Sequence, residues 1–156
     1  MTADTSPTSS ASSTSSTSFI VCPHCHTTNR LDIVDVANAT CGRCQQPMHS
    51  SKPVALDGAS LNKHISRSAM PVLVDFWAPW CGPCRTMAPQ FEAAAGDLAS
   101  EMLLAKVDTE AHQDVGARFN IRSIPTLALF KDGREVARTS GAMSRADLVK
   151  WARGQT

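Results

Sequence analysis

Residues 74–84 read VDFWAPWCGPC, and this stretch decides the fold. It lies at the end of an almost continuously apolar run, Met70 to Ala78, which is typical of a central β-strand buried on both faces. Cys81 and Cys84 follow the strand at once, and Pro83 between them is a residue that the first turn of a helix tolerates. The sequence therefore predicts a buried strand, a CxxC pair and a helix in direct succession.

The flanking sequence alternates strand-length apolar runs with helical patterns, which indicates an α/β sheet. Asp132 and Gly133 predict a hairpin turn, so the last two strands should form an antiparallel pair at the sheet edge. The expected elements are a strand over 53–57, a helix over 59–68, the strand in 70–78, a helix over 83–99 kinked at Pro89, a strand over 102–108, a short helix over 111–119, the strands TLALF and EVART, and a last helix opened by Ser144.

The position of the CxxC pair between strand and helix predicts redox chemistry. Unpaired N–H groups and the positive end of the helix favour a thiolate at Cys81, so its pKa should lie below that of a free cysteine. Cys84, one turn further on, can attack a mixed disulfide formed at Cys81. Gly82 and Pro83 allow the tight turn that brings the two sulfurs together.

Three further residues fit such a site. Asp75 is the only charge in VLVDFWA, so burial should raise its pKa and let it exchange a proton with the cysteines; the alternative is that it reaches water at the strand end. Pro125, at the head of a strand, indicates either a sheet edge or a cis bond. Gly141 is either a turn residue or a point where another backbone approaches closely.

With VDFWAPWCGPC, IRSIPT and the Lys-Asp-Gly hairpin, residues 53–154 resemble the thioredoxin family over two-thirds of the chain. The resemblance implies a thioredoxin fold, with a mixed five-stranded sheet between helices. It also implies Cys81 as the nucleophile, Cys84 as the resolving thiol, Asp75 as the buried acid and a cis bond before Pro125. The implied substrate groove is formed by Trp80, Gly82, Pro83, Ile124, Pro125 and Gly141.

One position departs from the family pattern. Many thioredoxins place a lysine near the buried acid on the third strand, and alignment on Asp108 puts Leu104 at that position. We therefore expect Asp75 to be desolvated without a compensating positive charge, and its pKa to be raised further for that reason.

The N-terminal third of the chain is organised differently. Residues 1–18 are mostly serine and threonine, which predicts a disordered tail. Residues 19–52 hold four cysteines and too few large apolar side chains for a core of their own. We therefore divide the chain into a tail over 1–18, a zinc-binding module over 19–52 and a thioredoxin domain over 53–156.

The four cysteines of the module are spaced as two CxxC knuckles. Cys22 and Cys25 are followed, after fifteen intervening residues, by Cys41 and Cys44, which fits a four-cysteine zinc ribbon with one structural zinc per chain. Two disulfides and four free thiols are the alternatives. The nearby histidines are expected to be bystanders, because four thiolates complete a tetrahedron; they are His24, His26 and His49.

Charge and hydropathy exclude several classes of function. The chain has 15 lysines and arginines against 14 acidic residues, a formal charge of +1, which gives no case for a nucleic acid or a membrane as the main partner. Neither a signal-peptide core nor an arginine-rich transit peptide is visible, nor is an apolar run of spanning length. We expect a cytoplasmic protein, which also disfavours a secreted disulfide scaffold.

A zinc module ahead of WCGPC is similar to the zinc-binding second class of bacterial thioredoxins. That resemblance implies a reductant of diverse protein disulfides, recharged by NADPH-dependent thioredoxin reductase. A disulfide oxidase or isomerase is a second hypothesis, although such relatives usually carry a histidine where Gly82-Pro83 stand. A redox-inert interaction protein is the third, and the presence of both Cys81 and Cys84 argues against it.

Overall fold

A computed structural model describes residues 17–156 of the chain. Most of the expected tail, residues 1–16, lies outside the described residues. Its predicted end at Ser18 was two residues too late, because Thr17 and Ser18 already pair with Asp32 and Leu31 in a β-hairpin. A serine- and threonine-rich composition could not reveal that pairing, which depends on the second strand.

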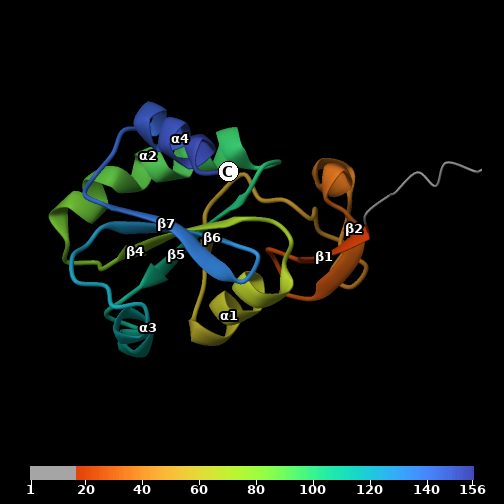
Figure 1. Ribbon diagram of the computed structural model, residues 1–156, viewed down its shortest axis with the longest axis horizontal. Helices are drawn as coiled ribbons and strands as arrows, with labels where there is room; N and C mark the ends of the chain where they lie inside the picture. The colour runs from red at the N-terminus through yellow and green to blue at the C-terminus, as the bar shows by residue number, and fades with distance from the viewer. Residues whose placement is uncertain (1–16) are drawn as a thin grey trace, which may run out of the picture.

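The main sheet has five strands in the order β3-β5-β4-β6-β7, so the predicted mixed sheet of the thioredoxin fold is confirmed (Figure 1). β4 lies at its centre, parallel to β5 and antiparallel to β6, with a seven-residue β7 at one edge. The strand bounds are β3 Val54–Ala55, β4 Val72–Trp77, β5 Leu103–Asp108, β6 Thr126–Lys131 and β7 Arg134–Ser140.

Helices cover both faces of this sheet (Figure 1). On one face, α1 (Gly58–Arg67) and α3 (Gln113–Arg118) enclose a core around Phe76. On the other, α2 (Gly82–Leu98) and α4 (Arg145–Gly154) enclose a core around Leu73. Among the described residues, no helix is both long enough and apolar enough to cross a membrane.

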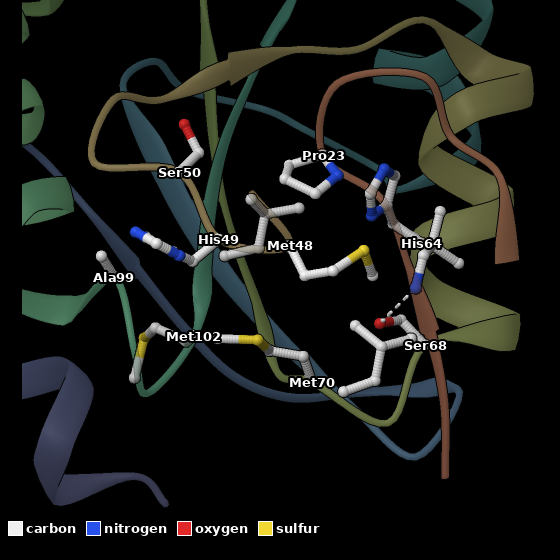
Figure 2. A pocket seen from close by; sticks show the side chains of 12 residues that line it. Pro23, Met48, His49, Ser50, His64, Ser68, Met70, Ala99 and Met102 are labelled. Atoms are coloured by element: carbon white, nitrogen blue, oxygen red, sulfur yellow. Dashed lines mark hydrogen bonds between the residues drawn. The ribbon is translucent and has the colours of Figure 1, made fainter. Parts of the chain in front are cut away.

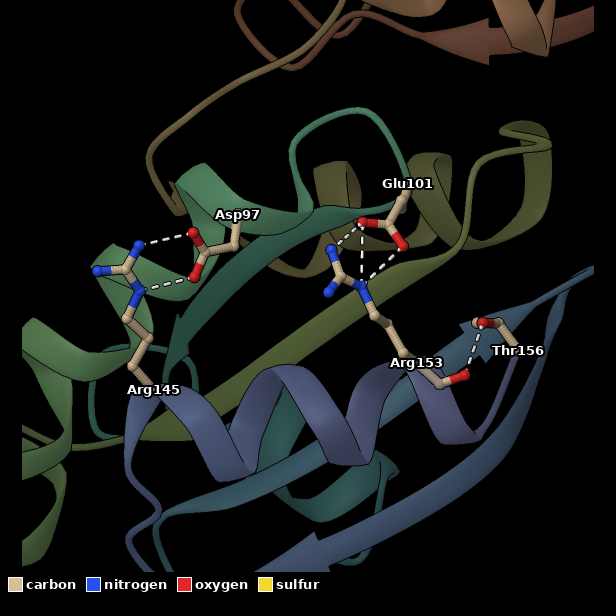
Figure 3. A network of polar contacts seen from close by, with 5 residues as sticks. All are labelled: Asp97, Glu101, Arg145, Arg153 and Thr156. Carbon is tan, nitrogen blue, oxygen red and sulfur yellow. Dashed lines mark hydrogen bonds and ion pairs between the residues drawn. The ribbon is translucent and has the colours of Figure 1, made fainter.

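Local side-chain bonds fix where the helices begin and how they pair. Asp57 and Ser60 form a capping box at α1, and the Ser144 hydroxyl accepts the N–H of Asp147 at α4. Two bidentate arginine–carboxylate pairs then tie α4 to α2 and the turn after it (Figure 3): Arg145 with Asp97 and Arg153 with Glu101. These pairs are exposed, so they orient α4 more than they stabilise it.

The N-terminal module is a hairpin of β1 (Thr17–Val21) and β2 (Thr28–Asp32), followed by the 3₁₀ helix η1 (Ile33–Asn38). It lies at the end of the main sheet opposite the start of α2 (Figure 1). Its small core consists of Ile20, Cys22, Val36, Cys41, Met48 and Met70. Met70 comes from the thioredoxin domain, so the module completes its core with a residue of the larger domain.

Several hydrogen bonds hold the module against the end of α1. The Ala69 N–H donates to the carbonyl of Phe19 at 2.8 Å, and the Ser68 hydroxyl accepts the N–H of Val21 at 3.3 Å. His26 Nδ1 and His64 Nε2 lie 3.0 Å apart. Burial lowers the pKa of His64 to about 3, so its ring is neutral. Figure 2 shows the cavity left at this junction, which measures about 10 Å³ and is lined by Met48, Met70 and Met102 among others.

This junction makes the module contribute to the stability of the larger domain. A chain that begins at Ser51 should keep the five-stranded sheet but unfold more readily, because Met70, 6% exposed in the intact chain, and His64, 1% exposed, lose their cover. Burial of one methionine-sized side chain contributes about 1.5–3 kcal/mol, and the free energy of unfolding should fall by roughly that amount. Urea denaturation of this shortened chain and of a chain that begins at Thr17 measures the difference in stability. Equal urea midpoints for the two chains would contradict the shared core.

Candidate functional site

Cys81 and Cys84 lie where the central strand meets a helix, and they form a disulfide. Cys81 is the N-cap residue of α2, just beyond the end of β4, and Cys84 belongs to the first turn. The N–H of Cys84 donates to Cys81 Sγ at 3.2 Å. In the reduced protein this donor and the positive helix end would stabilise a thiolate at Cys81. The arrangement can therefore carry out thiol–disulfide exchange.

A neighbouring loop carries further residues of the groove that the family resemblance implies. The peptide bond between Ile124 and Pro125 is cis, as the family resemblance implies. Cys81 Sγ lies 3.7 Å from the carbonyl oxygen of Ile124. Gly141, with φ of +98°, donates its N–H to the carbonyl of Pro125 at 2.9 Å, so it serves as a close backbone contact. Gly82 and Pro83 are exposed beside Cys81, and Trp80 is 70% exposed.

Asp75 lies in the middle of β4, not at its end, and it is 3% exposed. Its Oδ1 is buried without a hydrogen-bond partner among the described residues. Burial raises the pKa of Asp75 to about 7, and the nearby Lys106 opposes that rise. The carboxyl borders a cavity of about 200 Å³ that Lys106 and Glu92 also line. Asp75 is thus a buried acid that lines a cavity between β4, β5 and α2.

The expectation that Asp75 lacks a compensating charge is wrong. In the parallel pairing of β4 and β5, Asp75 stands opposite Lys106. Leu104 is buried in the apolar core with Leu73. Alignment on Asp108 assigned the family's lysine position to Leu104, two residues before Lys106. Residues two apart in a strand point to the same face, so the alignment identified the correct face but the wrong residue. Lys106 is the only basic residue in LLAKVD, and that signal could have identified it.

The four N-terminal cysteines converge on one point. Their sulfurs all lie within 4.8 Å of one another. Cys22 and Cys44 sulfurs are 3.7 Å apart, and Cys25 and Cys41 sulfurs 3.6 Å. A tetrahedron of four sulfurs at the zinc–thiolate bond length has edges of about 3.8 Å, whereas a disulfide bond is about 2.05 Å long. The donor set therefore fits a tetrahedral metal ion.

The two knuckles that carry these cysteines share one backbone geometry. The N–H of Cys22 donates to Thr27 O at 2.9 Å, and that of Cys41 donates to Gln46 O at 2.8 Å. The residues after each second cysteine, His26 and Gln45, have φ of +62° and +66°. Each knuckle thus turns through a left-handed residue, and their similarity accounts for the symmetrical convergence of the sulfurs.

Polar hydrogens around the cluster suit thiolate ligands. Cys22 Sγ accepts the N–H of His24 at 3.3 Å, and Cys41 Sγ accepts that of Arg43 at 3.4 Å. The Asn29 side-chain amide also donates to Cys41 Sγ, at 3.4 Å. Such bonds stabilise the charged form of a thiol and orient it toward a metal. None of the ring nitrogens of His24, His26 or His49 belongs to the cluster.

Comparisons with known proteins agree with this geometry. The sequence model of the family described as Thioredoxin matches residues 52–154. Thioredoxin C-3 of Corynebacterium nephridii is 43% identical over 133 residues, 85% of this chain and 91% of that protein. This alignment is too long to lie within residues 52–156 alone, so it includes part of the N-terminal module.

Two further relatives match the larger domain. Thioredoxin 1 of Synechococcus elongatus is 42% identical over 99 residues, 64% of this chain and 92% of that protein. The solved structure of a mutant thioredoxin from Halobacterium salinarum NRC-1 superposes with a TM-score of 0.61 at 31% identity. The match covers 68% of this chain and 92% of that one.

Asp75→Asn should stabilise the fold and slow disulfide reduction. The raised pKa means that the native state binds the proton more tightly, so native stability is lost as pH rises from the unfolded value near 3.8 through about 7. Asparagine does not ionise, so the gain in the free energy of unfolding of Asp75→Asn over the wild type should be small at pH 4 and reach roughly 2–4 kcal/mol at pH 8. Urea midpoints at both pH values measure it.

Asp132→Asn, at an exposed turn, is the matched control and should leave the midpoints unchanged. A midpoint for Asp75→Asn below that of the wild type at pH 8 would show that the Asp75 carboxyl is not a desolvated acid.

Proposed function

The chain belongs to the thioredoxin family of protein-disulfide reductases, and we propose that it acts through Cys81 as nucleophile and Cys84 as resolving thiol. The observation that supports this most strongly is the Cys81–Cys84 disulfide at the N-terminus of α2. A helix N-terminus lowers the pKa of a capping thiol, which supplies the attacking thiolate. The adjoining loop with Ile124 and Pro125 offers backbone for a substrate to bind.

The reaction consists of two exchanges. The Cys81 thiolate attacks one sulfur of a substrate disulfide, so a Cys81–substrate disulfide forms and the other substrate sulfur leaves as a thiolate. Cys84 then attacks Cys81 Sγ, which releases the second substrate sulfur and forms the Cys81–Cys84 disulfide. The substrate gains two electrons, and the protein dithiol loses them.

Asp75 is the group we propose to take the proton from Cys84 before its attack. With a pKa of about 7, its carboxyl changes protonation near neutral pH, as a general base should. The adjoining cavity of about 200 Å³ has room for water that could carry the proton onward. Lys106 would favour the ionised carboxylate and so keep Asp75 from becoming too weak an acid.

The substrate groove is proposed to comprise the surface around the disulfide, with Trp80 as its exposed apolar side chain. Backbone groups would provide most of its contacts, so diverse protein disulfides could bind. The groove residues are Trp80, Gly82, Pro83, Ile124, Pro125 and Gly141.

The oxidised protein requires a reductant, and we propose NADPH-dependent thioredoxin reductase in the cytoplasm. The family membership and the Gly82-Pro83 dipeptide support reduction over disulfide oxidation or isomerisation. Zinc-bound thiolates, too, persist best in a reducing compartment. Nucleic acids and membranes are not among the proposed partners, because the formal charge is only +1.

Zinc is the metal we propose for Cys22, Cys25, Cys41 and Cys44. Four thiolates leave no open position, so the ion would stabilise structure and take no part in catalysis. The metal module over 19–52 and the thioredoxin domain over 53–156 are proposed as functionally distinct units, because the module lies at the end of the main sheet opposite the start of α2, where Cys81 caps the helix.

Cys84→Ser should trap substrates. Without the resolving thiol the mixed disulfide at Cys81 persists, so partner proteins should remain covalently attached after denaturation and be released by dithiothreitol. Pull-down and mass spectrometry identify them. The matched control is Cys81→Ser with Cys84 intact, which should capture far fewer. Equal capture by the two variants would show that the roles are wrongly assigned.

The purified, reduced protein should contain one zinc ion per chain by elemental analysis. Peroxide should oxidise the four zinc thiolates to disulfides and release the ion, because sulfurs in disulfides no longer bind metal. The reduced Cys81–Cys84 pair is oxidised as well, so six thiols should be lost in all. A zinc-sensitive dye and a thiol assay follow the two events together. Absence of zinc from protein purified without chelators would contradict the proposal.

A further inference from the structure

A hollow adjoins the disulfide, and two of the groove residues already described, Trp80 and Ile124, help to line it. It measures about 210 Å³, and its apolar lining comes from Trp80, Ile121 and Ile124. Thr109, Arg122 and Ser123 supply its polar groups. Trp80 is the chain neighbour of Cys81, and the Ile124 carbonyl lies 3.7 Å from Cys81 Sγ. A chain bound at Cys81 would therefore place a side chain one or two residues away into this hollow.

Hydrogen bonds to backbone carbonyl groups hold the walls of the hollow. The N–H and hydroxyl of Thr109 both donate to the carbonyl of Trp77, at 2.8 and 3.0 Å. The N–H of Ile121 donates to Gly116 O at 2.9 Å, which closes the turn after α3. A side chain that enters thus meets a preformed surface, so little ordering cost opposes its binding.

Arg122 is the only charged side chain that lines this hollow. The ion pairs found within residues 17–156 involve Arg138, Arg145 and Arg153, and Arg122 takes part in none of them. Within the described part of the chain its side chain makes one long hydrogen bond, from Nε to Asn120 Oδ1 at 3.4 Å. The terminal nitrogens of its guanidinium are thus available to an incoming acceptor.

The acidic residues nearby do not neutralise this charge. Asp108 and Glu110 flank Thr109 in the chain, but neither lines the hollow. Asp108 Oδ1 accepts the N–H groups of Glu110 and Ala111 at 2.9 and 3.2 Å, so it is held in its own turn. The hollow therefore presents an apolar surface with one positive group and two hydroxyls.

We propose that this hollow selects disulfides flanked by an acidic residue, and that Arg122 binds its carboxylate. Glutamate suits the site best, because its methylene groups can lie on Trp80 and Ile124 while its carboxylate reaches the guanidinium. The proposal rests on the proposed function, since it concerns the substrate of that same disulfide. Arg122 acts as a specificity-determining residue and takes no part in bond exchange.

The test uses a family of disulfide-linked peptides that differ at one position. Glutamate or glutamine is placed one or two residues before or after the cystine, and kcat/KM for reduction is measured with the wild type. At one position the glutamate peptide should be reduced about two- to fivefold more efficiently, the range of an exposed ion pair. That preference should decline as salt is raised.

Variants then assign the preference to Arg122. Arg122→Met should bring the Glu/Gln ratio to one, Arg122→Lys should retain part of it, and Arg122→Glu should favour a lysine peptide instead. Arg134→Met, at an exposed position on the far hairpin, is the control and should keep the wild-type ratio. If wild type shows a ratio of one at all four positions, or Arg122→Met keeps its preference, the inference is overturned. Failure to reduce any peptide would instead overturn the proposed function.

Discussion

The junction between the central strand and α2 is the constraint on which the site depends. β4 is buried on both faces and ends at Trp77, and α2 begins at Gly82, so the chain must turn sharply between them. Cys81 caps the helix in that turn and accepts the N–H of Cys84. The same bonds that begin the helix thus prepare the sulfur for ionisation. A displacement of this turn would move Cys81 away from the carbonyl of Ile124.

Burial of this strand also determines the acid–base properties of the site. Asp75 lies on the face that α2 covers, which raises its pKa, and Lys106 on β5 limits the rise. The N-terminal module meets the opposite end of the same strand, because Met70, two residues before β4, completes its core. One strand thus joins the cysteine cluster at one end to the disulfide at the other. The module lies far from the disulfide, yet it packs against the residue that leads into the strand supporting the disulfide.

Local patterns predicted much of this molecule, and contacts between distant segments account for what they missed. The buried run before WCGPC, the Asp132-Gly133 turn and the paired CxxC spacings each reflect nearby residues, so the sequence sufficed for the five-stranded sheet and the cysteine cluster. Leu104 was chosen wrongly over Lys106 because the choice depends on the register between β4 and β5, which local sequence does not specify. The contact of His26 with His64 joins residues 38 positions apart, and no periodicity encodes it. Arg122 was missed for the same reason, since its hollow combines residues from three loops and from α3.

Reduction of insulin disulfides tests the central claim most directly, that a thiolate at the start of α2 reduces protein disulfides. NADPH oxidation and insulin precipitation are followed together, with thioredoxin reductase and catalytic amounts of this protein. The account predicts that both signals appear with the wild type, depend on the reductase and disappear with Cys81→Ser. A folded wild-type protein that stays oxidised in the presence of the reductase, or that leaves insulin intact once reduced, would contradict it.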